Sequence, residues 1–570
     1  MKLNPPGALA ATTCSFASCS LAILCAGFLP VMSASSAVNS QTGAKELTPT
    51  EQWVVAQLAA GEIADLSTHA EKDRKLSADF LQDLIMAELP GLKTHRNGLR
   101  IIGAIIDEPI DVRNAHIPGD VRLEQCHFNK TVTFVNANFL GTLSFNRSWF
   151  EGEADFMGMK VGGDALFNAT TFDGPAVRFK RVNVVNDFRA FAAKFRNKQH
   201  GAFFDRMKVG GAAGFDGASF EGHATFFRAD IAGKFTAAEA TFGNEQMDFR
   251  GMKVGVDADF SGALFEGQAS FGGADIKGNF TAFKARFQNE QLAGFLGMKV
   301  GGRANFNGAL FKGVAEFAKA DIASDFNASE ATFQNKANFS KLKVGGRALF
   351  VGARFDRRVD FSFADISWLD LSSASWPKLS GQVDLQGMNY NYIRAVVGDE
   401  PKSHEALLKL ADQSSYTADV YANLEAFFLR QGYRADADKA FIAGKCRERK
   451  KYFDGRDWPH WLGSWMLYLL VGYGRRSWQA AILCAILVAL GCILFAPEKM
   501  EPQNLGDTPR VYSRFWYSLG LFLPFVDLQS NKVWKPKADQ TRLRHYMRVH
   551  ILLGWILIPI VLAALTGILK

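Results

Sequence analysis

Bulky apolar residues recur every five or six positions through the middle of this 570-residue chain, and 38 of its 49 Phe lie between residues 128 and 363. A helix of 3.6 residues per turn would scatter such residues around its axis, and a flat strand would send neighbours to opposite faces. A chain that turns a corner after each of them points them all inward. One representative run is Phe128, Phe134, Phe139, Phe145, Phe150, Phe156, Val161, Phe167 and Phe172.

A longer period is superimposed on this spacing. The phrase Met-Lys-Val-Gly starts at residues 159, 207, 252 and 298, and Leu-Lys-Val-Gly starts at 342, so the steps are 48, 45, 46 and 44 residues. Four sides of five or six residues close a coil of about 22 residues, and each step is then two coils. The surplus residues mostly follow Phe195, Phe242 or Phe287, which predicts loops at one corner. Eleven or twelve coils, about 4.8 Å apart, predict a rod of roughly 55 Å.

The tripeptides around the inward positions include Ala154-Asp155-Phe156, Ala258-Asp259-Phe260 and Ala304-Asn305-Phe306. They resemble the unit of the pentapeptide-repeat family, which is Ala, then Asp or Asn, then Leu or Phe, then two freer residues. The resemblance covers roughly residues 101–371 and implies a mainly β solenoid, a right-handed quadrilateral β-helix. Alternating fives and sixes depart from the family's strict fives and predict less uniform sides. Asp or Asn is expected to bond a nearby backbone amide at each corner.

Helical segments are expected to cover both ends of the rod, because open coil ends expose unpaired strand edges. Thr50 with Glu51, and then Ser77, mark the expected starts of two N-terminal helices. Trp368, Leu369 and Trp376 offer apolar groups to the last coil. The predicted domains are a signal peptide at 1–37, a helical cap at 38–98, the β-helix at 99–376, a helical linker at 377–460 and a membrane module at 461–570.

Two segments are predicted to span a membrane. Residues 478–496 and 551–569 each contain about 19 residues without a formal charge, roughly enough to cross the hydrocarbon layer as helices. The shorter apolar runs 461–473 and 515–528 are expected to be interfacial or re-entrant. An alternative is a two-span pore with the rod as its sensor domain. The run between the spans would then supply the pore segment with Ser518, Gly520, Pro524 and Asp527, although no recognisable selectivity sequence follows.

The predicted signal peptide indicates an inner-membrane protein whose rod lies in the periplasm. The alternative is a rod in the cytoplasm. Four cysteines remain after the leader, too few to suggest a disulfide framework. The basic residues of the linker suit anionic lipid headgroups, or simply a solvated helix end. They are Lys445, Arg447, Arg449, Lys450 and Lys451.

Charge balance argues against a nucleic-acid partner. Residues 101–376 contain 32 Lys plus Arg against 31 Asp plus Glu. The same balance argues against DNA mimicry, which some pentapeptide-repeat relatives perform with an acidic surface. No GxSxG, HExxH, CxxC or phosphate-binding motif occurs, so we predict no catalytic residue, cofactor or metal site. A membrane-associated oxidoreductase is a further alternative, for which the sequence offers no cofactor site.

The repeated lysine is the most regular surface feature. Equivalent positions in successive steps predict a column with a spacing of about 10 Å, or two coil rises. Such a column could hold an anionic polymer such as an acidic glycan, and the alternative is that it only keeps one side soluble. Its members are Lys160, Lys208, Lys253, Lys299 and Lys343. We therefore predict a membrane-anchored binding or scaffolding module, with membrane lipid, a protein, an anionic glycan or a second copy of the chain as partner.

Overall fold

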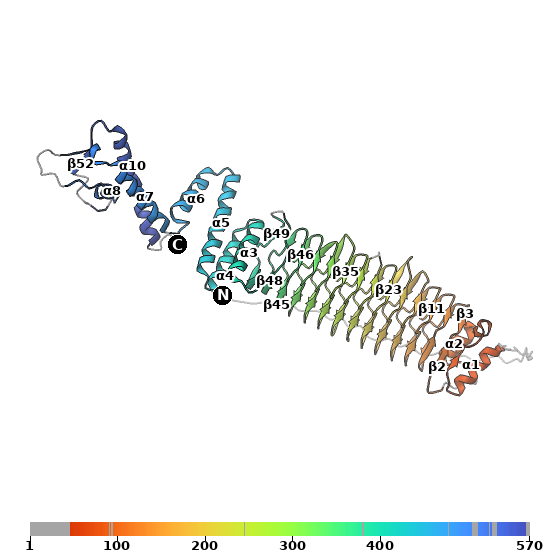
Figure 1. Cartoon of the computed structure of the whole chain (residues 1–570). Helices are drawn as coiled ribbons and strands as arrows, with labels where there is room; N and C mark the ends of the chain where they lie inside the picture. Colours follow the sequence, from red (N-terminus) through yellow and green to blue (C-terminus); the bar gives the residue numbers. More distant parts are fainter. Residues whose placement is uncertain are drawn as a thin grey trace, which may run out of the picture. The chain divides into compact units, whose positions relative to one another are not determined.

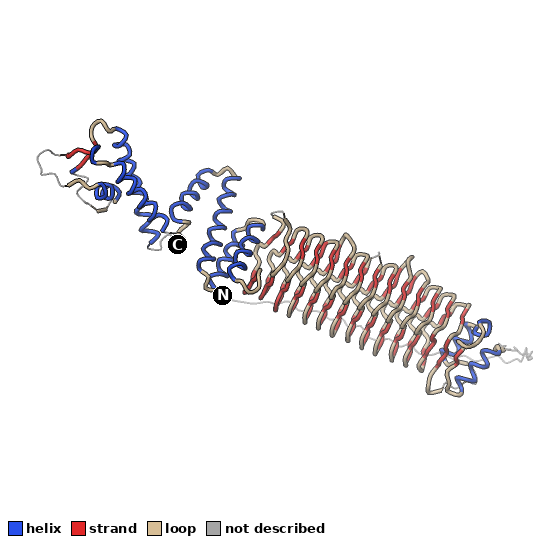
Figure 2. Tube along the Cα trace, viewed as in Figure 1, coloured by secondary structure: helices blue, strands red, loops and turns tan. Residues whose placement is uncertain are grey.

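The computed structural model describes residues 46–89, 92, 95–243, 246–378, 381–476, 478–503, 511–523, 525–526 and 533–565. The predicted signal peptide lies outside these residues. Residues 47–570 form one compact unit. Figures 1 and 2 show its central part as short strands stacked in successive coils, with helices at both ends of the stack.

Each coil has four sides, as predicted. One coil consists of β10 (Leu143–Ser144), β11 (Trp149–Phe150), β12 (Ala154–Asp155) and β13 (Lys160–Val161). Each strand pairs in parallel with its equivalent in the next coil, so that Phe150 lies beside Phe172, 22 residues later. The solenoid has about 13 turns rather than eleven or twelve. Only the strand edges at the two ends of the stack remain to be covered.

Stacked aromatic rings fill the rod. On the second side of the coils, the rings of Phe128 and Phe150 stack at 4.8 Å with planes 8° apart, and the same contact repeats in the following coils. Two other sides also carry Phe, as in the stacked pair Phe156 and Phe179 at 4.7 Å. The fourth side mostly carries Val or Ile, as at Val161 and Ile231. The prediction that the recurring bulky residues point inward is confirmed.

Side chains at the corners hold the turns. The Asp155 carboxylate accepts a hydrogen bond from the backbone N–H of Met157 at 2.9 Å, and Asn338 accepts one from Ser340 at 3.0 Å. These side chains replace a backbone partner where the chain leaves the strand. The role predicted for Asp and Asn is therefore confirmed.

The surplus residues lie at one corner. The connection from β19 (Lys194–Phe195) to β20 (Gly201–Phe203) has five residues, and that from β35 (Arg286–Phe287) to β36 (Leu292–Gly294) has four. The equivalent connection from β11 to β12 has three. The loop after Phe242 is at the same corner, although two of its residues lie outside the described ones. Lengthening the chain only between two sides leaves the stack of strands intact.

Two helices, α1 (Pro49–Ala59) and α2 (Ala78–Met86), lie at the first coil. Ser77 precedes α2 as predicted, but α1 starts after Thr48 rather than at Thr50. Thr48 caps the N-terminus of α1. Its hydroxyl accepts a hydrogen bond from the Glu51 N–H at 3.2 Å, and the Glu51 carboxylate accepts one from the Thr48 N–H at 2.8 Å. Glu51 also accepts the Ser77 hydroxyl at 2.7 Å, which ties the two helix starts together.

At the other end the rod continues beyond the predicted boundary at residue 376. Strands β48 (Asp365–Asp370), β49 (Val383–Asp384) and β50 (Asn389–Arg394) complete the last coil. Its inward positions are occupied by Val383, Met388 and Tyr390 instead of Phe, so the spacing pattern could not locate it.

A three-helix bundle covers this end. It contains α3 (Glu400–Gln413), α4 (Ala418–Arg430) and α5 (Arg434–Asp454). Helices α4 and α5 form a hairpin across Gly432, which adopts φ 86°, a conformation that favours glycine. Helix α4 is bonded to the last coil, because Asn423 donates to the Met388 carbonyl at 3.0 Å and Arg430 donates to the Tyr390 carbonyl at 3.0 Å. The edge strand β50 is thereby covered.

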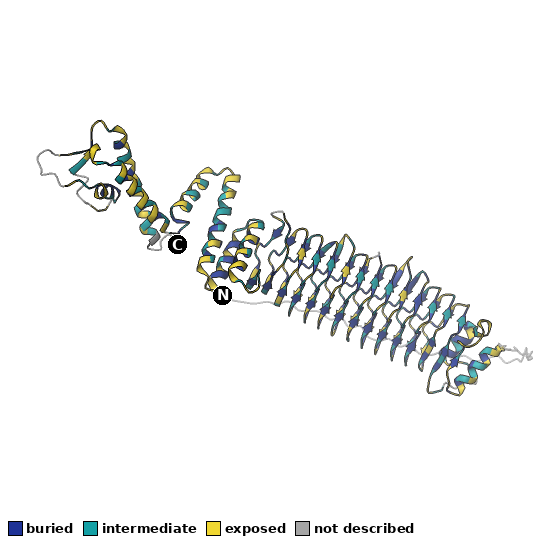
Figure 3. Cartoon of the chain, in the orientation of Figure 1, coloured by how far each residue is buried: buried dark blue, intermediate teal, exposed yellow. Residues whose placement is uncertain are grey.

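The C-terminal module contains α6 (Trp458–Val471), α7 (Trp478–Leu494), α8 (Arg514–Phe522) and α10 (Thr541–Leu565), with a small hairpin of β51 (Met500–Pro502) and β52 (Trp534–Pro536). Among the described residues, one helical stretch, Thr541–Ala563, is long and apolar enough to cross a membrane, with a mean hydropathy of 1.9. The other predicted span, α7, is 17 residues long. Helix α10 starts ten residues before the predicted 551, because nearly three further turns with three Arg among them continue it. Figure 3 shows exposed positions along α6, α7 and α10.

Candidate functional surfaces

The five predicted lysines lie in one column on the fourth side of the rod, and all five are exposed. They are not neighbours, however. Lys253 pairs in register with Asp230 on one side and Asp275 on the other. Read from the N-terminal coil onward, the column is His116, Asn138, Lys160, Asn183, Lys208, Asp230, Lys253, Asp275, Lys299, Asp321, Lys343, Asp365 and Asn389.

This alternation changes the electrostatics of the predicted site. From Lys208 to Asp365 every lysine has a carboxylate in the adjacent coil, about 4.8 Å along the rod. Opposite charges at cross-strand positions stabilise a sheet, and together they leave little net field. The column exists as predicted, but the aspartates oppose its use as a grip for a polyanion. The spacing of the lysines alone could not reveal them, because the intervening coils lack the Met-Lys-Val-Gly phrase.

The same column explains why that phrase ends in glycine. A Cβ at Gly210 would lie 2.1 Å from the Val185 carbonyl oxygen, and one at Gly255 would lie 2.1 Å from that of Ala232. At this corner, the backbone of every second coil lies too close to the carbonyl oxygen of the coil before it to hold any side chain, so glycine is required there. The two-coil period therefore has two parts: glycine is required at the corner of every second coil, and the charge in the column alternates with the same period from Lys208 onward.

Comparison with known proteins agrees with this geometry. Residues 113–160 and 123–171 match the model of a family described as pentapeptide repeats, in nine copies. The rod is built of pentapeptide repeats. No curated protein and no solved structure matches the chain. The matched residues all lie in the rod. None of them lies in the helices after residue 400.

Two of the four predicted pore residues, Pro524 and Asp527, lie outside the described residues. The other two, Ser518 and Gly520, are buried on α8. The Ser518 hydroxyl donates to the Val488 carbonyl at 2.8 Å and lies 3.3 Å from His550 Nε2. Within one chain, these residues therefore pack between helices and do not line an open channel. The pore itself stays a prediction.

His550 is the polar residue of this module that sequence analysis missed. It is fully buried on α10, and its Nδ1 lies 3.3 Å from the Tyr546 hydroxyl. Gly491 on α7 allows the close approach, since a Cβ there would lie 2.1 Å from the Ser518 hydroxyl. The sequence did contain a signal for this residue, since His550 directly precedes an apolar run. Ionisable groups are rare at such positions and often have a specific partner.

The loop before α7 is bound to the helical bundle. Arg475 forms ion pairs with Glu425 on α4 and, at 3.2 Å, with Asp438 on α5. Its guanidinium also lies 4.6 Å from the centre of the Phe441 ring. Since α4 is itself bonded to the last coil, a continuous set of contacts joins the pentapeptide-repeat rod to the start of α7.

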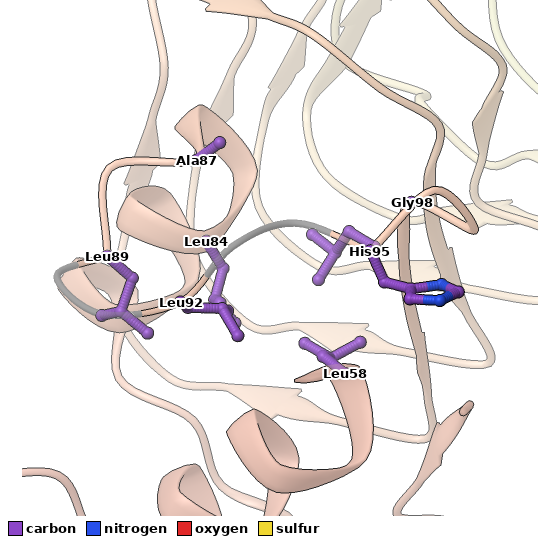
Figure 4. A pocket seen from close by; sticks show the side chains of 8 residues that line it. Leu58, Leu84, Ala87, Leu89, Leu92, His95 and Gly98 are labelled. Atoms are coloured by element: carbon purple, nitrogen blue, oxygen red, sulfur yellow. The ribbon is translucent and has the colours of Figure 1, made fainter. Parts of the chain in front are cut away.

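Several features that could suggest chemistry are structural. Cys126 is fully buried, and burial raises the pKa of its thiol to about 12, which leaves no reactive thiolate. The apolar cavity beside α1 and α2, between Leu58, Leu84 and Leu92, holds about 10 Å³, at most one water (Figure 4). The described residues contain no group of three or more His, Cys, Asp or Glu placed to hold a metal ion.

A groove of about 500 Å³ opens at the last coils of the rod. Arg354 and Asp356 pair there at 2.7 Å, with Arg357 and Lys378 nearby. A second groove, of about 560 Å³, lies along α7 and α8 and is lined almost wholly by apolar side chains.

Proposed function

We propose that this protein anchors a rigid pentapeptide-repeat rod to a membrane and acts there as a binding or scaffolding module. The rod supplies a long surface whose side chains are fixed by coil-to-coil pairing, which suits recognition of an extended partner. An envelope protein or glycan is the partner class that fits a rod displayed in this way.

The observation that carries this proposal is the unbroken connection from rod to apolar helix. Asn423 and Arg430 bind the last coil, and Arg475 binds the same bundle from the loop before α7. A freely hinged linker would need none of these bonds. The contacts support a rod held by the membrane module rather than a rod tethered loosely to it.

Membrane anchoring predicts that the full chain resists extraction by alkaline carbonate. Leu552 and Ile556 are exposed on α10 and would face lipid, so a double change to Arg should release the protein, because each charge costs about 3 kcal/mol at mid-bilayer. Leu140, exposed on the rod, provides the control, and Leu140→Arg should remain in the pellet. Extraction of the unaltered protein would refute the anchor.

We further propose the inner membrane, with a periplasmic rod. The apolar leader and the apolar helix α10 support this arrangement. A reporter fused after residue 400 tests it: a periplasm-active enzyme should be active there, and a cytoplasm-active one silent. The opposite pattern would place the rod in the cytoplasm while leaving the anchor intact.

A further inference from the structure

The end of α5 and the turn that follows it carry exposed cations. Of the basic residues at the end of α5, Lys445 pairs with Glu448 at 2.8 Å, and Arg447 donates to the Ser414 carbonyl at 2.8 Å. Arg449 lies 4.0 Å from the centre of the Trp465 ring. Three further cations, Lys450, Lys451 and Arg456, are exposed. The structure thus separates basic side chains that hold the bundle together from those directed to solvent.

Exposed aromatic rings cluster in the same stretch of the chain. Phe453 and Trp458 meet edge to face at 5.5 Å, and Trp458 meets Trp461 at 5.6 Å. Phe453 is 49% exposed and Trp458 is 54% exposed, although burial against the protein would be the usual state of such rings. Clustered aromatic rings beside Lys and Arg are typical of segments at the membrane–water interface.

Helix α6 continues this surface. Its 14 residues contain no Asp, Glu, Lys or Arg, and at about 21 Å it is too short to span the hydrocarbon layer. Leu462, Met466 and Leu469 are about half exposed. The end of α6 packs directly on α7, with Val471 against Ala480. An exposed apolar helix continuous with a membrane-anchored pair of helices is most readily covered by lipid.

Charge complementarity selects the lipid class. Residues 445–476 contain eight basic and three acidic residues, and of the acidic ones Glu448 and Asp457 are already bonded inside the protein. Each Lys or Arg close to an anionic membrane raises the affinity of the protein for that membrane by about fivefold.

We propose that α6 lies in the membrane interface and that Lys450, Lys451 and Arg456 bind anionic phospholipid headgroups. This inference rests on the proposed membrane anchor. It assigns a second membrane contact, 20 residues before α7 starts at Trp478, and orients the bundle that carries the rod. A second copy of the chain is the competing occupant, and the experiment distinguishes it.

The test is lysine acetylation of the full chain, quantified residue by residue by mass spectrometry. The protein is compared in phosphatidylcholine nanodiscs and in nanodiscs with about 30% phosphatidylglycerol. Acetylation of Lys450 and Lys451 should slow by about threefold or more in the anionic discs. Lys299 and Lys343, exposed on the rod, are internal controls and should react equally in both discs.

Matched variants complete the test. The Arg456→Glu variant should weaken the protection of Lys450 and Lys451, whereas Arg354→Glu, a change of equal charge at the rod, should not. Equal acetylation rates of the two lysines in both discs would overturn the lipid assignment while the anchor stands. Protection in phosphatidylcholine discs that depends on protein concentration would instead indicate a second copy. Failure of the protein to enter either disc would refute the anchor itself.

Discussion

Trp376 stacks on Phe355, with ring centres 5.2 Å apart and planes 16° apart, and so ends the Phe column on the second side of the rod. Each Phe in that column covers the ring before it. Without Trp376 the last ring would face solvent. Sequence analysis predicted that Trp376 would offer its ring to the last coil, but the structure places Trp376 within that coil, between β48 and β49, where it covers Phe355 of the coil before.

We expect Trp376→Ala to lower the free energy of unfolding of the last coils by about 2 kcal/mol, through lost apolar burial and ring stacking. The midpoint of chemical unfolding of the full chain in detergent, together with hydrogen exchange of β46 (Arg354–Phe355), measures the change. Trp376→Phe keeps a ring in place and should lose less than about half as much. Equal stability of the two variants would show that the stacked ring does not stabilise this end.

Asp370 should make the end of the rod sensitive to acid. Its side chain is 3% exposed and pairs with Arg394 of the adjacent strand. Burial raises the pKa of Asp370, but hydrogen bonds from Arg394 and Ser372 outweigh burial and hold that pKa below its ordinary value. A depressed folded-state pKa means that the stabilisation is complete above the unfolded value of about 3.9 and is lost as pH falls through the folded-state pKa.

The corresponding variant is Asp370→Asn. It should cost about 2 kcal/mol at pH 7, because Arg394 loses its charged partner, and the difference should shrink as the pH falls below the unfolded value of about 3.9 and through the lower folded-state pKa. Unfolding curves recorded across this range provide the measurement. A difference between the two proteins that stays constant with pH would contradict the assigned pKa shift.

The aspartates of the alternating column should suppress binding of polyanions. Changing Asp230, Asp275 and Asp321 to Asn leaves Lys208, Lys253 and Lys299 without neutralising neighbours in the column, so retention on a heparin column should shift to higher salt. Removing three carboxylates elsewhere, with Glu151, Glu266 and Glu330 changed to Gln, is the charge-matched control and should shift retention less. Equal shifts would mean that net charge, and not the column, decides binding.

The pore alternative predicts ion currents, and the packing of Ser518 against His550 predicts their absence. We expect the full chain reconstituted in planar bilayers to conduct no ions above background. Single-channel currents that disappear in Asp527→Ala would establish the pore and would require an arrangement of α8 different from the buried one.

The boundaries of the rod show how far sequence patterns extend. The four-sided coil, the inward Phe and the loop-bearing corner could all be predicted, because each depends on spacing within one coil. The last coil, from β48 to β50, could not, since Met388 and Tyr390 fill its interior without the five-and-six spacing. The start of α10 was missed for another reason, since residues 541–550 contain three Arg and therefore lie outside any charge-free span.

The sequence by itself determined the repeating unit, because a ring at every fifth or sixth residue can be buried only when the chain turns between rings. Tertiary structure decided which charged residues are neighbours on the surface of the rod. Residues paired across coils lie 21 or more positions apart, so only the register revealed that Lys253 lies between Asp230 and Asp275. Close approach of adjacent coils, at about 4.8 Å, converts distant sequence positions into immediate electrostatic neighbours.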